Sequence, residues 1–259
     1  MALLGGRLAA LVLRRYQWHD LEALPGRVAK GKLESLFGTE FWERIRGKVV
    51  IDFGCGQGHE AIDMARLGAA RVIGVETLEK WLAAARANLA RSGVTNCEFV
   101  RRTDEQADIV LSIDSFEHFD HPERILEEMA RLLKPDGRVI ASFGPPWYHP
   151  LGGHFPLFPW GHLVFAEKSL MTWRSQFKTD GATRFEEAEG GLNQMSIRKF
   201  ERLVSQSSLQ LESLKTIPIR AVRRLHCRLT REFFTSVVQA TLIHRTPRAR
   251  RSGIQTGLS

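Results

Sequence analysis

Three glycines and two carboxylates within one short stretch could together bind a nucleotide-like ligand. The stretch VVIDFGCGQGHEAIDMARLGAARVIGVE places Gly54, Gly56 and Gly58 after an apolar run that contains Asp52, and a second apolar run ends at Glu76. Glycines let a ligand approach the backbone where a Cβ atom would collide with it. A strand, a glycine turn and a helix in this order expose backbone N–H groups at the carboxyl edge of a sheet, where open α/β sheets bind ligands.

The glycine spacing separates two classes of nucleotide cofactor. A dinucleotide fingerprint reads G-x-G-x-x-G and would require the third glycine at position 59. That position is His59, and the chain instead reads G-x-G-x-G. The spacing therefore does not favour a nicotinamide dinucleotide.

Alternating strands and helices must position these residues. The apolar runs predict strands at 49–53, 71–75, 97–100, 108–113 and 138–143, separated by helices at 59–67, 78–92 and 121–133. A turn is expected at 135–137, and a further helix at 196–205 precedes strand-like segments at 209–219 and in 229–245. This alternation predicts an α/β fold with a mostly parallel sheet and helices on both faces.

Four motifs in this order resemble one known family. VVIDFGCGQG resembles motif I of the class I S-adenosylmethionine-dependent methyltransferases, and VIGVE, ADIVLSIDSFEHF and ILEEMARLLKPDGRVIASF resemble its later strand and helix motifs. The resemblance covers roughly residues 45–145 and is closest to small-molecule methyltransferases of quinone and natural-product biosynthesis. It implies a Rossmann-like, doubly wound sheet of seven strands, and S-adenosylmethionine as the cofactor.

The resemblance also implies roles for single residues. Glu76 would accept hydrogen bonds from both ribose hydroxyls, and Asp52 would orient the loop or meet the methionine ammonium group. Cys55 is expected to pack rather than to act as a nucleophile. The connection after the third strand is short, so the adenine contacts stay open among Arg102, Thr103 and Asp104. The expected cofactor-binding residues are Asp52, Gly54, Cys55, Gly56, Gly58, Glu76, Thr77, Arg102, Thr103, Ser112 and Ile113.

His118 is the candidate general base. It precedes a helix on a loop at the carboxyl edge, where the family often keeps a histidine near the transferred methyl group, although it could equally form part of the pocket wall. The surrounding FEHFDHPERI is rich in metal-ligand residue types. However, Asp120 and Glu123 fit a capping box with Pro122 in the first helical turn, so no metal site is predicted.

An aromatic and proline-rich insertion follows the fifth predicted strand. Residues 143–165 hold seven aromatic residues, five prolines and three histidines. Long irregular loops beside a ligand-binding edge are usually functional, so the insertion is expected to cover the acceptor substrate. A satellite core beneath a long loop is the alternative. The segment 190–196 would close the pocket or form a turn with a helix cap. The candidate acceptor-binding residues are Trp147, Tyr148, His149, His154, Phe158, Trp160 and His162.

The chain of 259 residues is expected to have three parts. These are an N-terminal helical cap (1–44), a methyltransferase domain (45–245, with the insertion 145–195 as substrate cover) and a basic disordered tail (246–259). Leu4, Leu8 and Leu11 have helical spacing, which predicts an amphipathic helix that packs on the domain or lies on a lipid surface.

The charge lies mostly at the C-terminal end. Residues 214–259 contain ten lysines and arginines against one acid, Glu232, whereas the whole chain carries +8. This segment could attract nucleic acid, an anionic membrane or an acidic substrate, with a solvated basic flank as the plainer alternative. Three scattered cysteines favour a reducing cytoplasm.

Together these features predict methyl transfer to an oxygen, nitrogen or carbon atom of a small-molecule acceptor. Two alternatives remain at this point: an RNA methyltransferase that uses the basic C-terminal segment, and a non-catalytic cofactor-binding or membrane-associated scaffold. The sequence does not predict the oligomeric state.

Overall fold

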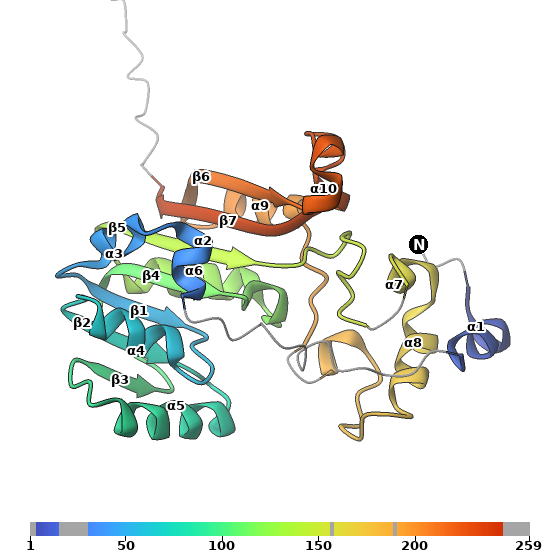
Figure 1. The fold of residues 1–259 in the computed structure, drawn as a ribbon, viewed down its shortest axis with the longest axis horizontal. Coiled ribbons are helices and arrows are strands. Elements are labelled where there is room, and N and C mark those ends of the chain that lie inside the picture. The colour runs from blue at the N-terminus through green and yellow to red at the C-terminus, as the bar shows by residue number, and fades with distance from the viewer. Residues whose placement is uncertain (1–3, 16–30, 156–157, 189–190, 246–259) are drawn as a thin grey trace, which may run out of the picture.

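The fold is built on one seven-stranded sheet (Figure 1). The structure, a computed structural model, describes residues 4–15, 31–155, 158–188 and 191–245. The strand order is β3-β2-β1-β4-β5-β7-β6, in which β7 runs antiparallel to both neighbours and the other pairings are parallel. The predicted mostly parallel sheet is therefore confirmed. The strands are β1 (Val49–Phe53), β2 (Arg71–Val75), β3 (Cys97–Val100), β4 (Ala107–Ile113), β5 (Leu133–Phe143), β6 (Leu209–Pro218) and β7 (Thr235–His244).

Helices cover both faces of this sheet, each over its own hydrophobic core. One core contains Leu126 of α6 (Pro122–Leu132) and Phe200 of α9 (Ile197–Gln206). The other contains Phe41 and Leu82 and is formed by α2 (Lys32–Phe37), α3 (Glu40–Ile45), α4 (His59–Arg66) and α5 (Glu79–Ser92). Central strands such as β1 are buried on both sides, which is why they read as continuous apolar runs.

Two local predictions around α6 are wrong. The expected turn at 135–137 lies within β5, where the pairing with β4 jumps from Ala107–Leu133 to Ile109–Arg138 and so forms an irregularity in the strand. The capping box is also absent. The N-cap residue is His121 and no side chain caps it, so Asp120 lies one position too early, while Pro122 does occupy the first turn as expected.

A third core lies beside the sheet, on the side to which β1, β4 and β5 point (Figure 1). It joins the insertion helices α7 (Gly161–Val164) and α8 (Glu167–Arg174) to the N-terminal helix α1 (Gly6–Leu13). Leu4 N donates to Val164 O at 2.8 Å and Ala166 N donates to Leu4 O at 2.7 Å, so the chain start is fixed to the insertion. We call this cluster, together with its lining residues Trp147, Phe155, Phe165, Trp173 and Phe185, the satellite core.

The buried face of α1 is not the predicted one. Leu8 and Leu11 are exposed, whereas Ala9 and Leu13 are buried in the satellite core. The prediction counted Leu4 as the first residue of the apolar stripe, but Leu4 precedes the helix and forms a bridge with Phe165. The described parts of 1–44 thus pack in two places, α1 on the insertion and α2 and α3 on the sheet. The tail 246–259 lies outside the described residues.

The remaining elements are short. The 3-10 helix η2 (Phe116–His118) follows β4, and η3 (Phe185–Glu187) lies in the insertion. η4 (Arg220–Leu225) and α10 (Arg231–Phe234) connect β6 to β7. None of the helices in the described ranges is long and apolar enough to span a membrane.

We expect Trp147→Ala to destabilise the protein. Trp147 is buried against Phe185, with ring centroids 5.4 Å apart, so truncation removes the centre of the satellite core. Truncations of buried aromatic residues typically cost about 3–5 kcal/mol. Thermal unfolding of the variant should show a clear drop in the transition temperature, whereas Tyr148→Ala, which alters the exposed neighbouring ring, should change it little. Equal transition temperatures for Trp147→Ala and the unchanged protein would contradict the assignment.

Candidate functional site

The carboxylate of Glu76 ties the glycine loop to the end of β2. Its Oε2 atom accepts a hydrogen bond from Gly56 N at 3.0 Å, and its Oε1 atom accepts one from Leu78 N at 2.9 Å. Gly54 N and Cys55 N both donate to Val75 O, at 2.9 and 3.1 Å. The loop after β1 is therefore folded over the end of β2, with its backbone around one buried acid.

Two glycines of this loop are required for different structural reasons. A Cβ atom on Gly58 would lie 2.3 Å from Cζ of Phe99, so Gly58 is required for packing. Gly56 has a φ of +52° and a Cβ atom there would meet nothing within 4 Å. Open space on the Cβ side of Gly56, next to the Glu76 carboxylate, suits a ligand whose hydroxyl groups donate to that carboxylate.

Asp52 supplies a buried carboxyl group at the same edge. Its Oδ2 atom accepts no hydrogen bond from the described residues. Burial, together with the nearby Glu60 and Glu76 carboxylates, raises the pKa of Asp52 to about 8, and the Lys32 ammonium opposes this shift. Lys32 itself lies 3.0 Å from Asp114 and 3.5 Å from Glu60. A surplus of carboxylates with an unpartnered oxygen is complementary to a ligand ammonium group. These residues fit the cofactor expected from the sequence.

Other expected cofactor residues lie close by in the fold. Ser112 is buried near the end of β4, and its Oγ atom accepts or donates no hydrogen bond among the described residues. Ile113 follows it and pairs with Ser142 of β5. Thr77 is exposed directly after Glu76. Burial raises the pKa of the Cys55 thiol well above its usual range, which supports a packing role rather than a nucleophilic one.

The connection from β3 to β4 lies mostly away from the glycine loop and Glu76. Thr103 O accepts from Arg131 Nη2 at 3.2 Å, and Asp104 Oδ1 accepts from Arg131 Nη1 at 2.9 Å. Arg131 lies in the last turn of α6, which is at the amino edge of the sheet because α6 leads into β5. The structure therefore does not bring Thr103 or Asp104 to Glu76. Arg102 is exposed near the end of β3 and stays a candidate.

Leu78 is a candidate that the sequence analysis missed. It is exposed two residues after Glu76, to which its backbone N–H is bonded. An exposed leucine beside the expected ribose position offers an apolar surface to a planar base. The signal in the sequence was an apolar residue closely following a strand-end acid.

His118 is held in a defined tautomer. Its Nδ1 atom lies 2.8 Å from Gly191 O, and because a carbonyl only accepts, Nδ1 must carry the proton. The neutral ring therefore presents Nε2 as a proton acceptor. The ring of His154 lies 5.5 Å away, between centroids, so this residue of the insertion does reach His118.

Glu117 is a second residue that the sequence analysis missed. It is buried, its Oε1 atom accepts from Gly144 N at 3.0 Å, and its Oε2 atom has no partner among the described residues. Burial is the largest cause that raises the pKa of Glu117 to about 7, and Asp114 contributes in the same direction. Glu117 thus joins the loop after β4 to the loop after β5.

Asn193 braces the same loop from the segment 191–196. Its Nδ2 atom donates to Phe116 O at 2.6 Å and to Phe119 O at 2.8 Å, while Asn193 N donates to Glu117 O at 3.0 Å. Ser196 then caps α9 by accepting from Lys199 N at 3.1 Å. The segment therefore supports the His118 loop and caps a helix. The helix cap is one of the two roles that the sequence left open, and closure of the pocket stays a prediction. Gly190 lies outside the described residues.

Most of the expected acceptor-binding side chains are engaged elsewhere. His162 Nε2 lies 2.6 Å from Trp147 O, and both residues are buried in or against the satellite core. His149 Nδ1 accepts from Leu151 N at 3.0 Å, and burial lowers the pKa of His149 to about 4. Trp147 thus belongs to the satellite core, which the sequence analysis held as the alternative, because its ring finds aromatic partners within the insertion.

The remaining candidates also contact partners other than His118. Trp160 Nε1 donates to Tyr148 O at 2.9 Å, and Phe158 contacts Phe165 with centroids 6.0 Å apart. The Tyr148 ring contacts Phe233, 5.8 Å away, in the connection between β6 and β7. Of the seven expected residues in the described part of the insertion, His154 is the one with a ring contact to His118.

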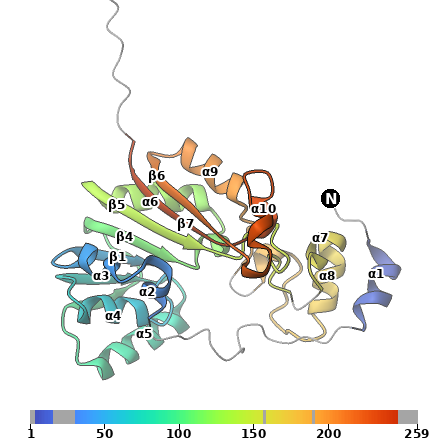
Figure 2. The ribbon, with the colours of Figure 1, turned by 45° about the horizontal axis from the view of Figure 1, so that its top comes forward.

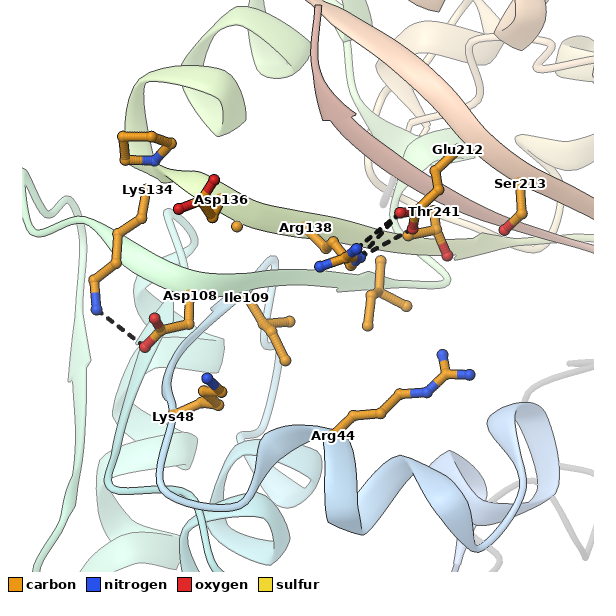
Figure 3. A pocket seen from close by; sticks show the side chains of 13 residues that line it. Arg44, Lys48, Asp108, Ile109, Lys134, Asp136, Arg138, Glu212, Ser213 and Thr241 are labelled. Atoms are coloured by element: carbon orange, nitrogen blue, oxygen red, sulfur yellow. Dashed lines mark hydrogen bonds and ion pairs between the residues drawn. The ribbon is translucent and has the colours of Figure 1, made fainter.

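A separate pocket lies at the opposite edge of the sheet, between the starts of β4 and β5 (Figure 3). Lys134 Nζ is bonded to Asp108 at 3.0 Å, and Arg138 makes three hydrogen bonds of 2.9–3.2 Å to Glu212. These charges neutralise one another, and the glycine loop, Glu76 and His118 all lie at the other edge. Among the described residues, no group of three His, Cys, Asp or Glu side chains is placed to hold a metal ion.

Comparison with known proteins relates the chain to methyltransferases. Residues 51–141 match the family described as methyltransferase domain. A ubiquinone biosynthesis O-methyltransferase of Neisseria meningitidis serogroup C is 39% identical over 106 residues, which are 38% of this chain and 44% of that protein. A ribosomal protein L11 methyltransferase of Vibrio cholerae is 38% identical over 100 residues, 38% of this chain and 34% of that protein. The chain thus spans less than half the length of these relatives.

Solved structures share the fold. An S-adenosylmethionine-dependent methyltransferase from Mesorhizobium loti superposes with a TM-score of 0.52 at 17% identity, over 78% of this chain and 92% of that one. At this identity the likeness concerns the fold, and it confirms the Rossmann-like class that the motifs predicted.

We expect Glu76→Ala to weaken S-adenosylmethionine binding at least about tenfold. The substitution removes the expected acceptor of the ribose hydroxyls and releases Gly56 N and Leu78 N, which shape the loop around the ligand. A hydrogen bond lost from the bound state costs about 1–3 kcal/mol. Titration calorimetry with the cofactor measures the change. Glu98→Ala, which removes an exposed acid from β3, serves as the matched control and should bind normally. An unchanged dissociation constant for Glu76→Ala would exclude the carboxylate from the site.

We also expect cofactor binding at neutral pH to release about one proton. With a pKa of about 8, Asp52 is mostly protonated before binding, and a cationic ligand nearby favours its ionised form. Calorimetry in two buffers of different ionisation enthalpy counts the protons released. Asp52→Asn keeps the shape but has no proton to lose, so its binding enthalpy should not depend on the buffer. Equal proton release by both proteins would show that Asp52 is not the source.

Proposed function

We propose that this chain is a class I S-adenosylmethionine-dependent methyltransferase that methylates a hydroxyl group of a small-molecule acceptor. The observation that carries the proposal is the pairing of a cofactor-type loop with a histidine whose tautomer leaves Nε2 open. The similarity of 106 residues of this chain to a ubiquinone biosynthesis O-methyltransferase supports oxygen as the atom methylated.

The cofactor supplies an activated methyl group on a sulfonium, which a nucleophile takes by in-line displacement. Glu76 would accept hydrogen bonds from the ribose, and Asp52 would face the ammonium group of the methionine part. Ser112 would contribute polar groups from the end of β4. The protein mainly has to hold both partners in line and exclude water.

A hydroxyl acceptor must lose its proton as the methyl group arrives. His118 can take it at Nε2, because Nδ1 is already bonded to Gly191 O. Glu117 holds Gly144 and Asn193 holds the carbonyls of Phe116 and Phe119, so the loop that carries His118 is fixed at three points. A base held in one orientation loses little entropy when the acceptor binds.

The acceptor class is tested by label transfer. The protein is incubated with methyl-labelled cofactor and cell extract, which is then separated into organic-soluble metabolites, RNA and protein. Label should enter a metabolite with a free hydroxyl group, and blocking that hydroxyl should abolish uptake. Label in RNA, or in ribosomal protein as the L11 relative would suggest, would overturn the small-molecule assignment.

We expect His118→Asn to lower kcat by roughly 10²–10⁴-fold. Asparagine retains an N–H donor for Gly191 O but cannot accept a proton at neutral pH, so the loop should stay in place. Cofactor affinity, measured by calorimetry, should be unchanged. His154→Asn is the matched control, since it removes the neighbouring ring without removing the base, and it should act mainly on the acceptor KM. If His118→Asn raised only KM, the residue would be part of the pocket wall.

A further inference from the structure

The connection between β6 and β7 forms an exposed tip at the same edge as the candidate site. Because β7 runs antiparallel to both β5 and β6, β6 ends at the carboxyl edge, where η4 and α10 follow. Figure 2 shows α10 beside the loops that lead from the sheet to α7 and α8. Phe233 of this tip contacts Tyr148, 5.8 Å away, four residues after Gly144.

The tip exposes large apolar side chains. Leu225 is 59% exposed, Leu229 is 83% exposed and Phe233 is 42% exposed. All three lie within nine residues of one another, on a connection with little core of its own. Grouped exposed apolar residues on a folded protein usually mark a surface that binds a membrane, another protein or a ligand.

Arginines surround these apolar residues without compensating acids. Arg220, Arg223, Arg224 and Arg228 are exposed, and no ion pair to any of them occurs among the described residues. Glu232 is the nearest acid in the chain, but it is buried and accepts from Ile197 N at 3.1 Å and Arg198 N at 2.8 Å. Its carboxylate therefore caps the first backbone N–H groups of α9 and does not offset the charge of the arginines. Arg231 of α10 is paired with Glu201 at 2.6 Å, so the uncompensated positive charge of the tip comes from the four exposed arginines.

We propose that this tip, defined by Arg220, Arg223, Arg224, Leu225, Arg228, Leu229 and Phe233, docks on an anionic lipid surface. Apolar side chains that enter the headgroup region and arginines that meet lipid phosphates act together in such binding. RNA would bind the arginines but would gain little from the leucines, because nucleobases stack on aromatic rings and guanidinium planes. Two of the three apolar residues here are leucines.

Docking through the tip turns the carboxyl edge of the sheet toward the bilayer. The glycine loop and His118 lie at that edge, so an acceptor that partitions into the membrane would reach the site over a short path. This consequence rests on the proposed function, whereas the docking itself needs neither cofactor nor methyl transfer. A protein that does not bind vesicles therefore contradicts only the docking proposal, and a protein that transfers no label contradicts only the proposed function.

The test is co-flotation of the purified full chain with vesicles. The protein should float with phosphatidylglycerol–phosphatidylcholine vesicles, remain unbound with phosphatidylcholine alone, and detach at high salt because surface attraction is screened. Leu225→Ser with Leu229→Ser should weaken binding at least about tenfold, since both leucines lose apolar burial. Arg223→Glu with Arg228→Glu should weaken it about 30-fold or more and remove the preference for anionic lipid.

Matched variants elsewhere decide whether the tip is responsible. Leu67→Ser alters an exposed leucine after α4 at the far edge, and Leu8→Ser with Leu11→Ser alters the exposed face of α1. Both should float normally, and cofactor binding by every variant reports that the fold is intact. Loss of binding through α1 instead of the tip would overturn the proposal. So would arginine-dependent retention on single-stranded RNA, unaffected by the leucine substitutions, in a protein that ignores vesicles.

Discussion

The hydrogen bonds from Gly56 N and Leu78 N to the Glu76 carboxylate hold the site together. They fold the loop after β1 across the end of β2 and fix where α4 begins. Phe99 of β3 then fills the space that Gly58 and Gly74 leave without side chains. One buried acid thus sets the relative position of three strand ends, and the open space beside the Gly56 Cα follows from that arrangement.

Keeping carboxylates at this edge has an energetic consequence. Burial raises the pKa of Asp52 to about 8 and that of Glu117 to about 7, well above the usual values of 3.8 and 4.5. Because the folded protein binds these protons more tightly than the unfolded chain, their contribution to stability is largest in acid and declines as the pH rises through this window. A cationic ligand near Asp52 relieves part of that loss. The destabilised carboxylate and the affinity for an ammonium group have the same physical origin.

The sequence predicted the sheet well because its signals there are local. The bounds of β1, β2 and β3 follow from apolar runs between glycines and charges, and Glu76 was found from its place at a strand end. The failures concern contacts between distant segments. The Trp147 side chain packs in the satellite core because Phe185 and α1 supply partners there. Thr103 lies away from the site because the connection between β3 and β4 runs back to Arg131. The role of Glu117 could not be predicted because its partner, Gly144, belongs to another loop.

Acceptor recognition must therefore come from fewer side chains than the composition of the insertion suggests. The aromatic residues of the satellite core stabilise the insertion itself, and His162 and Trp160 bond to backbone carbonyls within it. The insertion contacts the candidate base through the ring of His154, 5.5 Å from that of His118, and through Gly191 O, 2.8 Å from His118 Nδ1. An insertion packed on its own core that reaches the base through one ring and one backbone carbonyl can position an acceptor without changing the cofactor loop. Under the proposed function, separate segments of the chain would carry acceptor choice and cofactor binding, and both meet at the edge where the parallel strands end.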